Sequence, residues 1–169
     1  MALTKTLIIS PPHSSRRPFH IFTSPTQTIT TNFYVGVSSL RYFEFRPEHL
    51  PYEEAKTSCV AQGGTLAEPR DEAQFGLIQA FSAVANRFWL GGQDTVADPL
   101  NQNILFVSDN TPVPLNSGFF APGEPNNSRQ REYCLEFLLP INGLNDESCL
   151  TASPYICEFG ASGPNSVLC

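Results

Sequence analysis

Basic side chains are scarce in this chain of 169 residues, which has 10 Lys and Arg against 16 Asp and Glu. The net charge of −6 argues against general nucleic-acid binding, because that function needs a basic surface for the phosphates. The sequence also lacks any apolar run close to the roughly 18 residues that cross a bilayer. Only three His are present, two of them near the N-terminus, so a His-rich transition-metal site is disfavoured.

Acidic residues are absent from residues 1–39, where Ser, Thr and Pro fill 17 positions. This composition is typical of a segment without a packed core, so we interpret residues 1–39 as a disordered leader or tail. Its acid-poor character also loosely fits an organelle transit peptide, and a wrongly placed start codon is a further alternative. We expect the folded domain to begin near Leu40.

Residue patterns after Leu40 predict two helices and several short strands. The first helix is expected over 51–59, after a strand at 40–45 bounded by Pro47, and the second from Asp71 to Val84. Short apolar runs at 88–90, 104–107, 133–139 and 155–157 predict the remaining strands. Two helices followed by an antiparallel sheet with long intervening loops make an α+β domain.

The cysteines contain no Cys-x-x-Cys pair, which argues against a zinc knuckle or a thioredoxin-type site. Their clustering in the C-terminal third favours disulfides, and hence an oxidising compartment. The pairing stays open, since five choices of the unpaired Cys times three pairings of the others give fifteen arrangements. Reduced thiols buried as small hydrophobic side chains are the alternative. The five are Cys59, Cys134, Cys149, Cys157 and Cys169.

Oxygen-bearing side chains stand shortly before two of these cysteines, and they are Glu124, Asn126, Glu132, Asn145 and Asp146. Carboxylate and amide oxygens suit calcium, which takes ~6–8 oxygen ligands in adaptable geometry. Without a cation the three carboxylates would repel one another. Taken alone, the cluster is weak evidence for a metal site, because acidic residues in loops are mostly exposed to water.

The order and spacing of these residues resemble a known family, the C-type lectin-like domains that bind calcium and carbohydrate. The resemblance covers residues 40–159 and leaves 160–169 as a C-terminal tail. It rests on Cys59 after the first helix, on Trp89-Leu90-Gly91-Gly92, on the Glu124-Pro125-Asn126 triplet ten residues before Cys134, on Asn145-Asp146, and on the spacing Cys149-x7-Cys157.

The resemblance implies an α+β, C-type lectin-like fold with two helices, short antiparallel sheets, a long calcium-binding loop region and two nested disulfides. The disulfides would be Cys59–Cys157 and Cys134–Cys149, and the peptide bond before Pro125 would be cis. It also implies a calcium site formed by Glu124, Asn126, Glu132, Asn145 and Asp146.

The resemblance further implies a secreted lectin whose partners are glycans or glycoproteins. Two vicinal hydroxyls of the sugar would coordinate the calcium directly. The order Glu-Pro-Asn resembles the version of the motif associated with mannose, glucose, fucose or N-acetylglucosamine. Unpaired Cys169 is a candidate for a disulfide that links two chains. The residues in contact with the sugar would be Glu124, Asn126, Glu132 and Asn145.

A second calcium site is less well supported by the sequence. Asp94 and Asp98 are candidate ligands, but Asn127 and Tyr133 stand where the family often has acids.

Two rival functions remain at this point. The same fold could bind a protein or ice instead of a sugar. An enzyme would need Glu124 and Glu132 as an acid–base pair acting on a glycoside. No hydrophobic pocket that would raise the pKa of one carboxyl is evident in the sequence, so we expect no catalytic activity.

Overall fold

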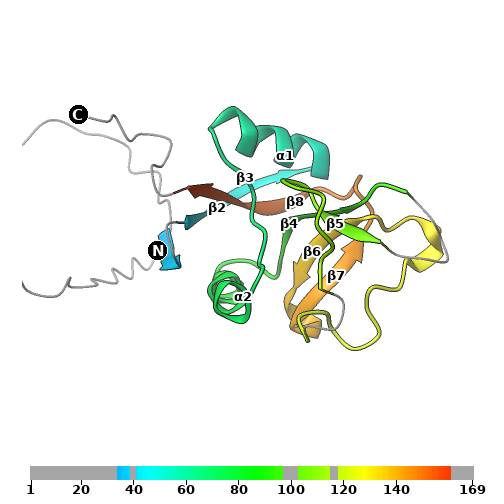
Figure 1. Ribbon diagram of the computed structural model, residues 1–169. Coiled ribbons are helices and arrows are strands. Elements are labelled where there is room, and N and C mark those ends of the chain that lie inside the picture. The colour runs from blue at the N-terminus through cyan, green and yellow to red at the C-terminus, as the bar shows by residue number, and fades with distance from the viewer. Residues whose placement is uncertain (1–33, 39–40, 97–102, 115–117, 161–169) are drawn as a thin grey trace, which may run out of the picture. The chain divides into compact units, whose positions relative to one another are not determined.

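The computed structural model describes residues 34–38, 41–96, 103–114 and 118–160 (Figure 1). The helices in these ranges are α1 (Tyr52–Ala61) and α2 (Glu72–Gln79), with 3₁₀ helices at Ala80–Ala83, Ser128–Gln130 and Leu139–Ile141. The strands are β1 (Tyr34–Ser38), β2 (Arg41–Leu50), β3 (Thr65–Leu66), β4 (Arg87–Asp94), β5 (Ile104–Phe106), β6 (Cys134–Leu138), β7 (Gly143–Glu147) and β8 (Ser153–Gly160). No helix of the described ranges is long and apolar enough to span a membrane.

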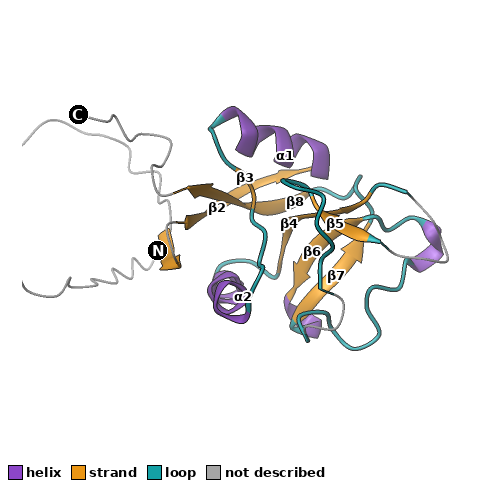
Figure 2. Cartoon of the chain, in the orientation of Figure 1, coloured by secondary structure: helices purple, strands orange, loops and turns teal. Residues whose placement is uncertain are grey.

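The described strands form one sheet in the order β1-β2-β8-β4-β6-β7, with β3 paired to β8 and β5 to β4 (Figure 2). The pairs are antiparallel except β4 and β8, which run parallel at the pair Trp89–Tyr155. The predicted α+β fold with two helices is therefore confirmed. The antiparallel sheets that we expected are joined through this parallel contact into a single mixed sheet.

The two helices pack on opposite faces of the sheet, because the side chains of β8 alternate between the faces. Cys157 and Phe159 lie in one core cluster with Tyr52 of α1. Ile156 lies in the other cluster with Phe75 of α2. Figure 1 shows α1 and α2 on either side of the central strands.

The starts of both helices follow from the sequence. α1 begins after Pro51, a residue that suits the first turn of a helix because it lacks an N–H donor. α2 begins after Asp71, whose side chain accepts a hydrogen bond from the Gln74 N–H at 2.8 Å. The second helix was expected to reach Val84, but its α-helical part ends at Gln79 and continues as a 3₁₀ helix.

The strand that we expected to be bounded by Pro47 continues to Leu50. The register of β2 against β8 shifts between Arg46 and Leu50. Proline is tolerated at such an irregularity, because its missing N–H is not needed for a regular ladder.

β1 precedes Leu40, where the folded domain was expected to begin. It pairs with β2, with Tyr34 opposite Glu44, and so belongs to the same sheet. Residues 1–33 and 161–169 lie outside the described residues. The limits 40–159 and the assignments of a leader and a C-terminal tail stay predictions.

Aromatic side chains fix the position of β4 within the core. Phe88 stacks on Phe137 of β6 with ring centroids 5.1 Å apart, and Trp89 meets Tyr52 edge to face at 5.4 Å. The indole N–H of Trp89 donates to the Leu50 carbonyl oxygen at 2.9 Å, so its polar atom has a partner. β6 and β7 extend the sheet from this fixed strand.

Both implied disulfides are present. Cys59–Cys157 joins α1 to β8, and Cys134–Cys149 joins the start of β6 to the turn after β7. The carbonyl of Cys149 also accepts a hydrogen bond from the Tyr52 N–H at 3.0 Å, which ties this turn to α1. The shorter bridge therefore closes the β6–β7 hairpin.

Replacing each disulfide by two alanines should destabilise the protein by different amounts. The chain-entropy model gives roughly 3 kcal/mol for a bridge that closes about 15 residues and about 4.7 kcal/mol for one that closes about 100. Urea unfolding of oxidised protein should therefore rank wild type above C134A/C149A, and C134A/C149A above C59A/C157A. The reverse order of the two variants would contradict this account.

Candidate functional site

The predicted ligands come from two segments that meet at one edge of the sheet. Glu124, Asn126 and Glu132 belong to the loop between β5 and β6, whereas Asn145 and Asp146 lie on β7. The sequence did not predict β7, because its residues GLNDE show no alternation of apolar side chains. Four of these five residues are nevertheless buried. The Asn-Asp pair is thus held by strand pairing rather than by a loop.

The fully buried carboxylate of Asp146 holds the loop against β7. Its two oxygens accept hydrogen bonds from the backbone N–H groups of Asn126, at 2.9 Å, and Asn127, at 2.7 Å. Asn127 has a φ of 45°, in the left-handed region that Asn adopts more readily than most residues. These two bonds fix the turn after the triplet relative to the sheet.

The same loop covers the outer edge of β7 (Figure 1). The Leu144 N–H donates to the Phe119 carbonyl at 2.8 Å, and the Leu144 carbonyl accepts from the Ala121 N–H at 3.1 Å. A Cβ atom at Gly143 would lie 2.7 Å from the Ala121 nitrogen, so this close approach requires glycine.

Within the triplet, the Glu124–Pro125 peptide bond is cis, as the resemblance implied. The side-chain Nδ2 of Asn126 donates to Oε2 of Glu124 at 2.6 Å. Oε2 of Glu132 accepts a hydrogen bond from the Ser128 N–H at 2.9 Å. The amide oxygen of Asn126 and one oxygen of each carboxylate take no part in these bonds.

Negative charge accumulates where the loop meets β7. Burial raises the pKa of Glu124, the hydrogen bond from Asn126 opposes this, and the charge of Asp146 raises the pKa further. Burial likewise raises the pKa of Glu132, and the charges of Asp146, Glu147 and Glu124 add to the increase. The carboxylates of the loop and of β7 are therefore close enough to repel one another. A cation among them would remove this repulsion.

A buried charge network beside Asn145 was missed by the sequence analysis. The Nδ2 of Asn145 donates to Oε1 of Glu136 on β6 at 3.0 Å, and Arg87 on β4 donates to both oxygens of Glu136 and to Glu147. Burial raises the pKa of Glu136 to about 7, against the opposing hydrogen bond from Asn145 and charge of Arg87. A Glu inside the apolar run Cys134–Leu138 was the available signal, because a buried carboxylate needs partners.

Of the two candidate ligands for a second calcium, the structure describes only Asp94. It is buried at the end of β4, and its Oδ1 accepts a hydrogen bond from the Val96 N–H at 3.0 Å. Asp98 lies outside the described residues. Asn127 is buried and accepts the Glu132 N–H through its side-chain oxygen at 3.1 Å. The second site stays a prediction.

Among the described residues, no three His, Cys, Asp or Glu side chains form a metal-binding group by themselves. The predicted calcium site contains three carboxylates, of Glu124, Glu132 and Asp146, which by the same finding do not form such a group, together with two Asn amides. All five offer oxygen and none offers sulfur or a ring nitrogen, which fits calcium better than zinc. The repulsion among the carboxylates is the electrostatic condition that a cation relieves. By donor chemistry, these residues fit calcium.

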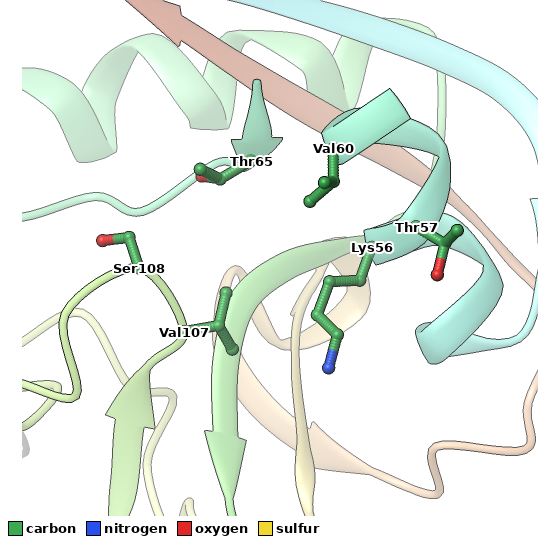
Figure 3. A pocket seen from close by; sticks show the side chains of 6 residues that line it. All are labelled: Lys56, Thr57, Val60, Thr65, Val107 and Ser108. Atoms are coloured by element: carbon green, nitrogen blue, oxygen red, sulfur yellow. The ribbon is translucent and has the colours of Figure 1, made fainter. Parts of the chain in front are cut away.

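An apolar pocket of about 210 Å³ lies between α1 and the segments around β3 and β5. Figure 3 shows its six lining side chains, which are Lys56, Thr57, Val60, Thr65, Val107 and Ser108. The lining contains no carboxylate or amide side chain and includes none of the predicted ligands. This pocket is therefore distinct from the candidate calcium site.

The model of the family "Lectin C-type domain" matches residues 48–159. The chain therefore belongs to the C-type lectin domain family, and the resemblance found in the sequence is confirmed. Membership supports carbohydrate binding in general. The similar proteins are non-enzymatic binding proteins, and residues 48–159 accordingly form a binding domain rather than an enzymatic one.

Two relatives illustrate the extent of the similarity. Collectin-11 of Bos taurus is 32% identical over 114 residues, which are 66% of this chain and 40% of that protein. C-type lectin domain family 3 member A of Bos taurus is 32% identical over 115 residues, which are 64% of this chain and 54% of that protein. The chain thus spans only about two fifths of the length of the collectin that it matches.

Solved structures share the fold. TC14, a C-type lectin from the tunicate Polyandrocarpa misakiensis, superposes with a TM-score of 0.62 at 29% identity, covering 70% of this chain and 96% of TC14. A calcium-independent type II antifreeze protein superposes with a TM-score of 0.61 at 22% identity, covering 75% of this chain and 91% of that one. The fold alone therefore does not identify the ligand.

The substitution Asp146→Asn should loosen the loop in calcium-free buffer. One backbone N–H, of Asn126 or Asn127, would then face an NH₂ group instead of an oxygen. We expect a loss of about 1–3 kcal/mol in the free energy of unfolding, measured with urea, and faster hydrogen exchange at Asn127. Asp109→Asn is the matched control, because exposed Asp109 also accepts a backbone N–H, from Thr111, but lies near the β5 end of the same loop. Equal exchange at Asn127 in both variants would refute the role of Asp146.

Proposed function

We propose that the chain is a calcium-dependent lectin that binds sugars of the mannose, glucose, fucose and N-acetylglucosamine type. The observation that carries this proposal is a set of three mutually repelling carboxylates and two amides at the junction of one loop and β7. Asp146 would contribute its backbone carbonyl as well as its side chain. The calcium ligands would be Glu124, Asn126, Glu132, Asn145 and Asp146.

The proposed sugar contacts follow from the hydrogen-bonding capacity of four of these side chains. When bound, calcium would offer open coordination positions to two vicinal sugar hydroxyls. The carboxylates of Glu124 and Glu132 would accept hydrogen bonds from those hydroxyls. Asn126 and Asn145 each use one N–H on a carboxylate, at 2.6 and 3.0 Å. The second N–H of each amide remains to donate to the sugar oxygens.

The order Glu124-Pro125-Asn126 supports the mannose type of sugar. A Gln-Pro-Asp order, which resembles the galactose type, would replace the acceptor-only side chain at position 124 by one with donors, and the amide at position 126 by an acceptor-only carboxylate. Because the contact is small and polar, we expect a monovalent Kd near millimolar, about −4 kcal/mol. Useful avidity then requires several sites.

We also propose that the protein is secreted and that its partners are glycans or glycoproteins. Two disulfides support an oxidising compartment. The lectin domain would comprise residues 40–159, between the leader and the C-terminal tail. A disulfide through Cys169 would link two chains and would raise the number of sites per molecule.

A module that binds a protein or ice is the second candidate. Its support is the fold shared with a calcium-independent antifreeze protein. Such a module would not be retained by a sugar, so a binding experiment separates the two candidates.

The protein should be retained on mannose-agarose in millimolar calcium and released by EDTA and by free mannose. Glu132→Gln should reduce retention at least tenfold, because a neutral amide is a weaker calcium ligand and offers fewer acceptors. Glu54→Gln, on the exposed part of α1, is the matched control and should be retained like the wild type. If calorimetry shows no heat when calcium chloride is titrated into oxidised, folded protein, the proposed function is wrong.

The double substitution Glu124→Gln with Asn126→Asp should shift the sugar preference toward galactose. It exchanges donors and acceptors at both ends of the triplet while keeping the side-chain lengths. Competition of mannose and galactose for the immobilised protein measures the preference. An unchanged preference would count against direct coordination of the sugar at this loop.

A further inference from the structure

The orientation of the Asn145 amide is set by a residue outside the proposed ligands. An Asn amide has an oxygen end and an NH₂ end, and only the oxygen end can bind a cation. In the structure the NH₂ end donates to Oε1 of Glu136 at 3.0 Å. Arg87 donates to both oxygens of Glu136, so this carboxylate acts as an acceptor and can receive the NH₂ end of Asn145 but not the oxygen end. The oxygen of Asn145 is thereby turned away from Glu136.

Glu136 is in turn fixed by Arg87. Nε and Nη2 of Arg87 lie 2.9 and 2.8 Å from Oε2 of Glu136, and Nη2 also lies 2.9 Å from Oε1. Arg87 reaches Glu147 as well. The guanidinium is always protonated, and such paired contacts are strong and directional. Since Glu136 is fully buried, this pairing also offsets the cost of keeping its charge out of water.

We infer that Glu136, held by Arg87, is a positioning residue that keeps the Asn145 amide oxygen directed to the calcium site. Neither Glu136 nor Arg87 would touch the cation or the sugar. The inference rests on the proposed function, because the orientation of Asn145 matters only if its oxygen is a ligand. It adds β4 and β6 to the elements that define the site.

The substitution Glu136→Gln should reverse the orientation of the Asn145 side-chain amide. A Gln carbonyl at the place of Oε2 keeps the charged bonds from Nε and Nη2 of Arg87 and gives up only the contact of Nη2 with Oε1. The two bonds that remain are stronger than the neutral bond from Asn145. The NH₂ group of the Gln then points to Asn145 and demands an acceptor there. Asn145 must turn its oxygen inward and present its NH₂ end to the cation. Removing a residue that orients a metal ligand by a hydrogen bond typically lowers metal affinity roughly 10- to 100-fold, and we expect a decrease of this size in E136Q.

A second substitution restores binding if the account is correct. With Asn145→Asp in the Glu136→Gln background, one carboxylate oxygen accepts from the Gln NH₂ and the other is available to the cation. Calcium affinity of E136Q/N145D should return to within about threefold of the wild type. A merely structural role for Glu136 gives no reason for such a rescue.

The matched control is Glu158→Gln on β8. Glu158 is also a buried carboxylate that pairs with an Arg, Arg41, and accepts one further N–H, from Glu68 at 2.9 Å. It contacts none of the proposed ligands. This variant should show a similar change in unfolding midpoint to E136Q when EDTA is present, with unchanged calcium affinity.

The test is calorimetric titration of calcium chloride into the four proteins, with urea unfolding in EDTA and NMR of the Asn145 side-chain NH₂ signals. The inference is supported if E136Q has a lower calcium affinity than the wild type, if E136Q/N145D regains that affinity, and if E158Q keeps it. Equal affinity in E136Q and wild type overturns it while the proposed function stands. A loss in E136Q without rescue also overturns it. Absence of calcium binding in the wild type refutes the proposed function and, with it, this inference.

Discussion

Two hydrogen bonds from the backbone of a long loop to one buried carboxylate connect the candidate site to the sheet. Asp146 accepts them from Asn126 and Asn127, and Asp146 itself is held by the pairing of β7 with β6. A buried carboxylate is costly unless it has such partners, so the loop and the strand depend on each other. The position of the loop therefore follows from the register of β6 and β7 and, through Phe88 and Phe137, from the aromatic core.

The helices could be predicted from the sequence, because their signals are local, whereas the cysteines alone left fifteen arrangements open and the disulfide pairing came from the family resemblance. β7 could not be predicted, since a search for alternating apolar residues recognises only strands whose buried side chains are apolar. The contact between Arg87 and Glu136 joins residues 49 positions apart, and neither residue is unusual in its local sequence except for one Glu in an apolar run. The five proposed ligands were found through a family resemblance. The sequence did not show that the loop carrying three of them is bonded to β7, which carries the other two.

In this molecule, the residues that stabilise the fold differ from those that would select a ligand. Trp89, the two disulfides and the packed aromatic side chains stabilise an architecture that a lectin and an antifreeze protein share. What would distinguish one function from another is a small number of oxygen and nitrogen atoms on one loop and one strand. The charge network around Glu136 contacts one of these residues, Asn145, from within the core, and a comparison of folds does not reveal this contact.

β7 is the last strand in the order of the sheet, and the loop that carries three of the proposed ligands also bonds to its outer side through Phe119 and Ala121. An uncovered strand of this kind is a template for pairing with a second chain. The loop therefore shields this edge of the sheet from pairing with another chain. Cleavage of the loop by a protease would expose that strand, so cleaved molecules would be prone to self-association.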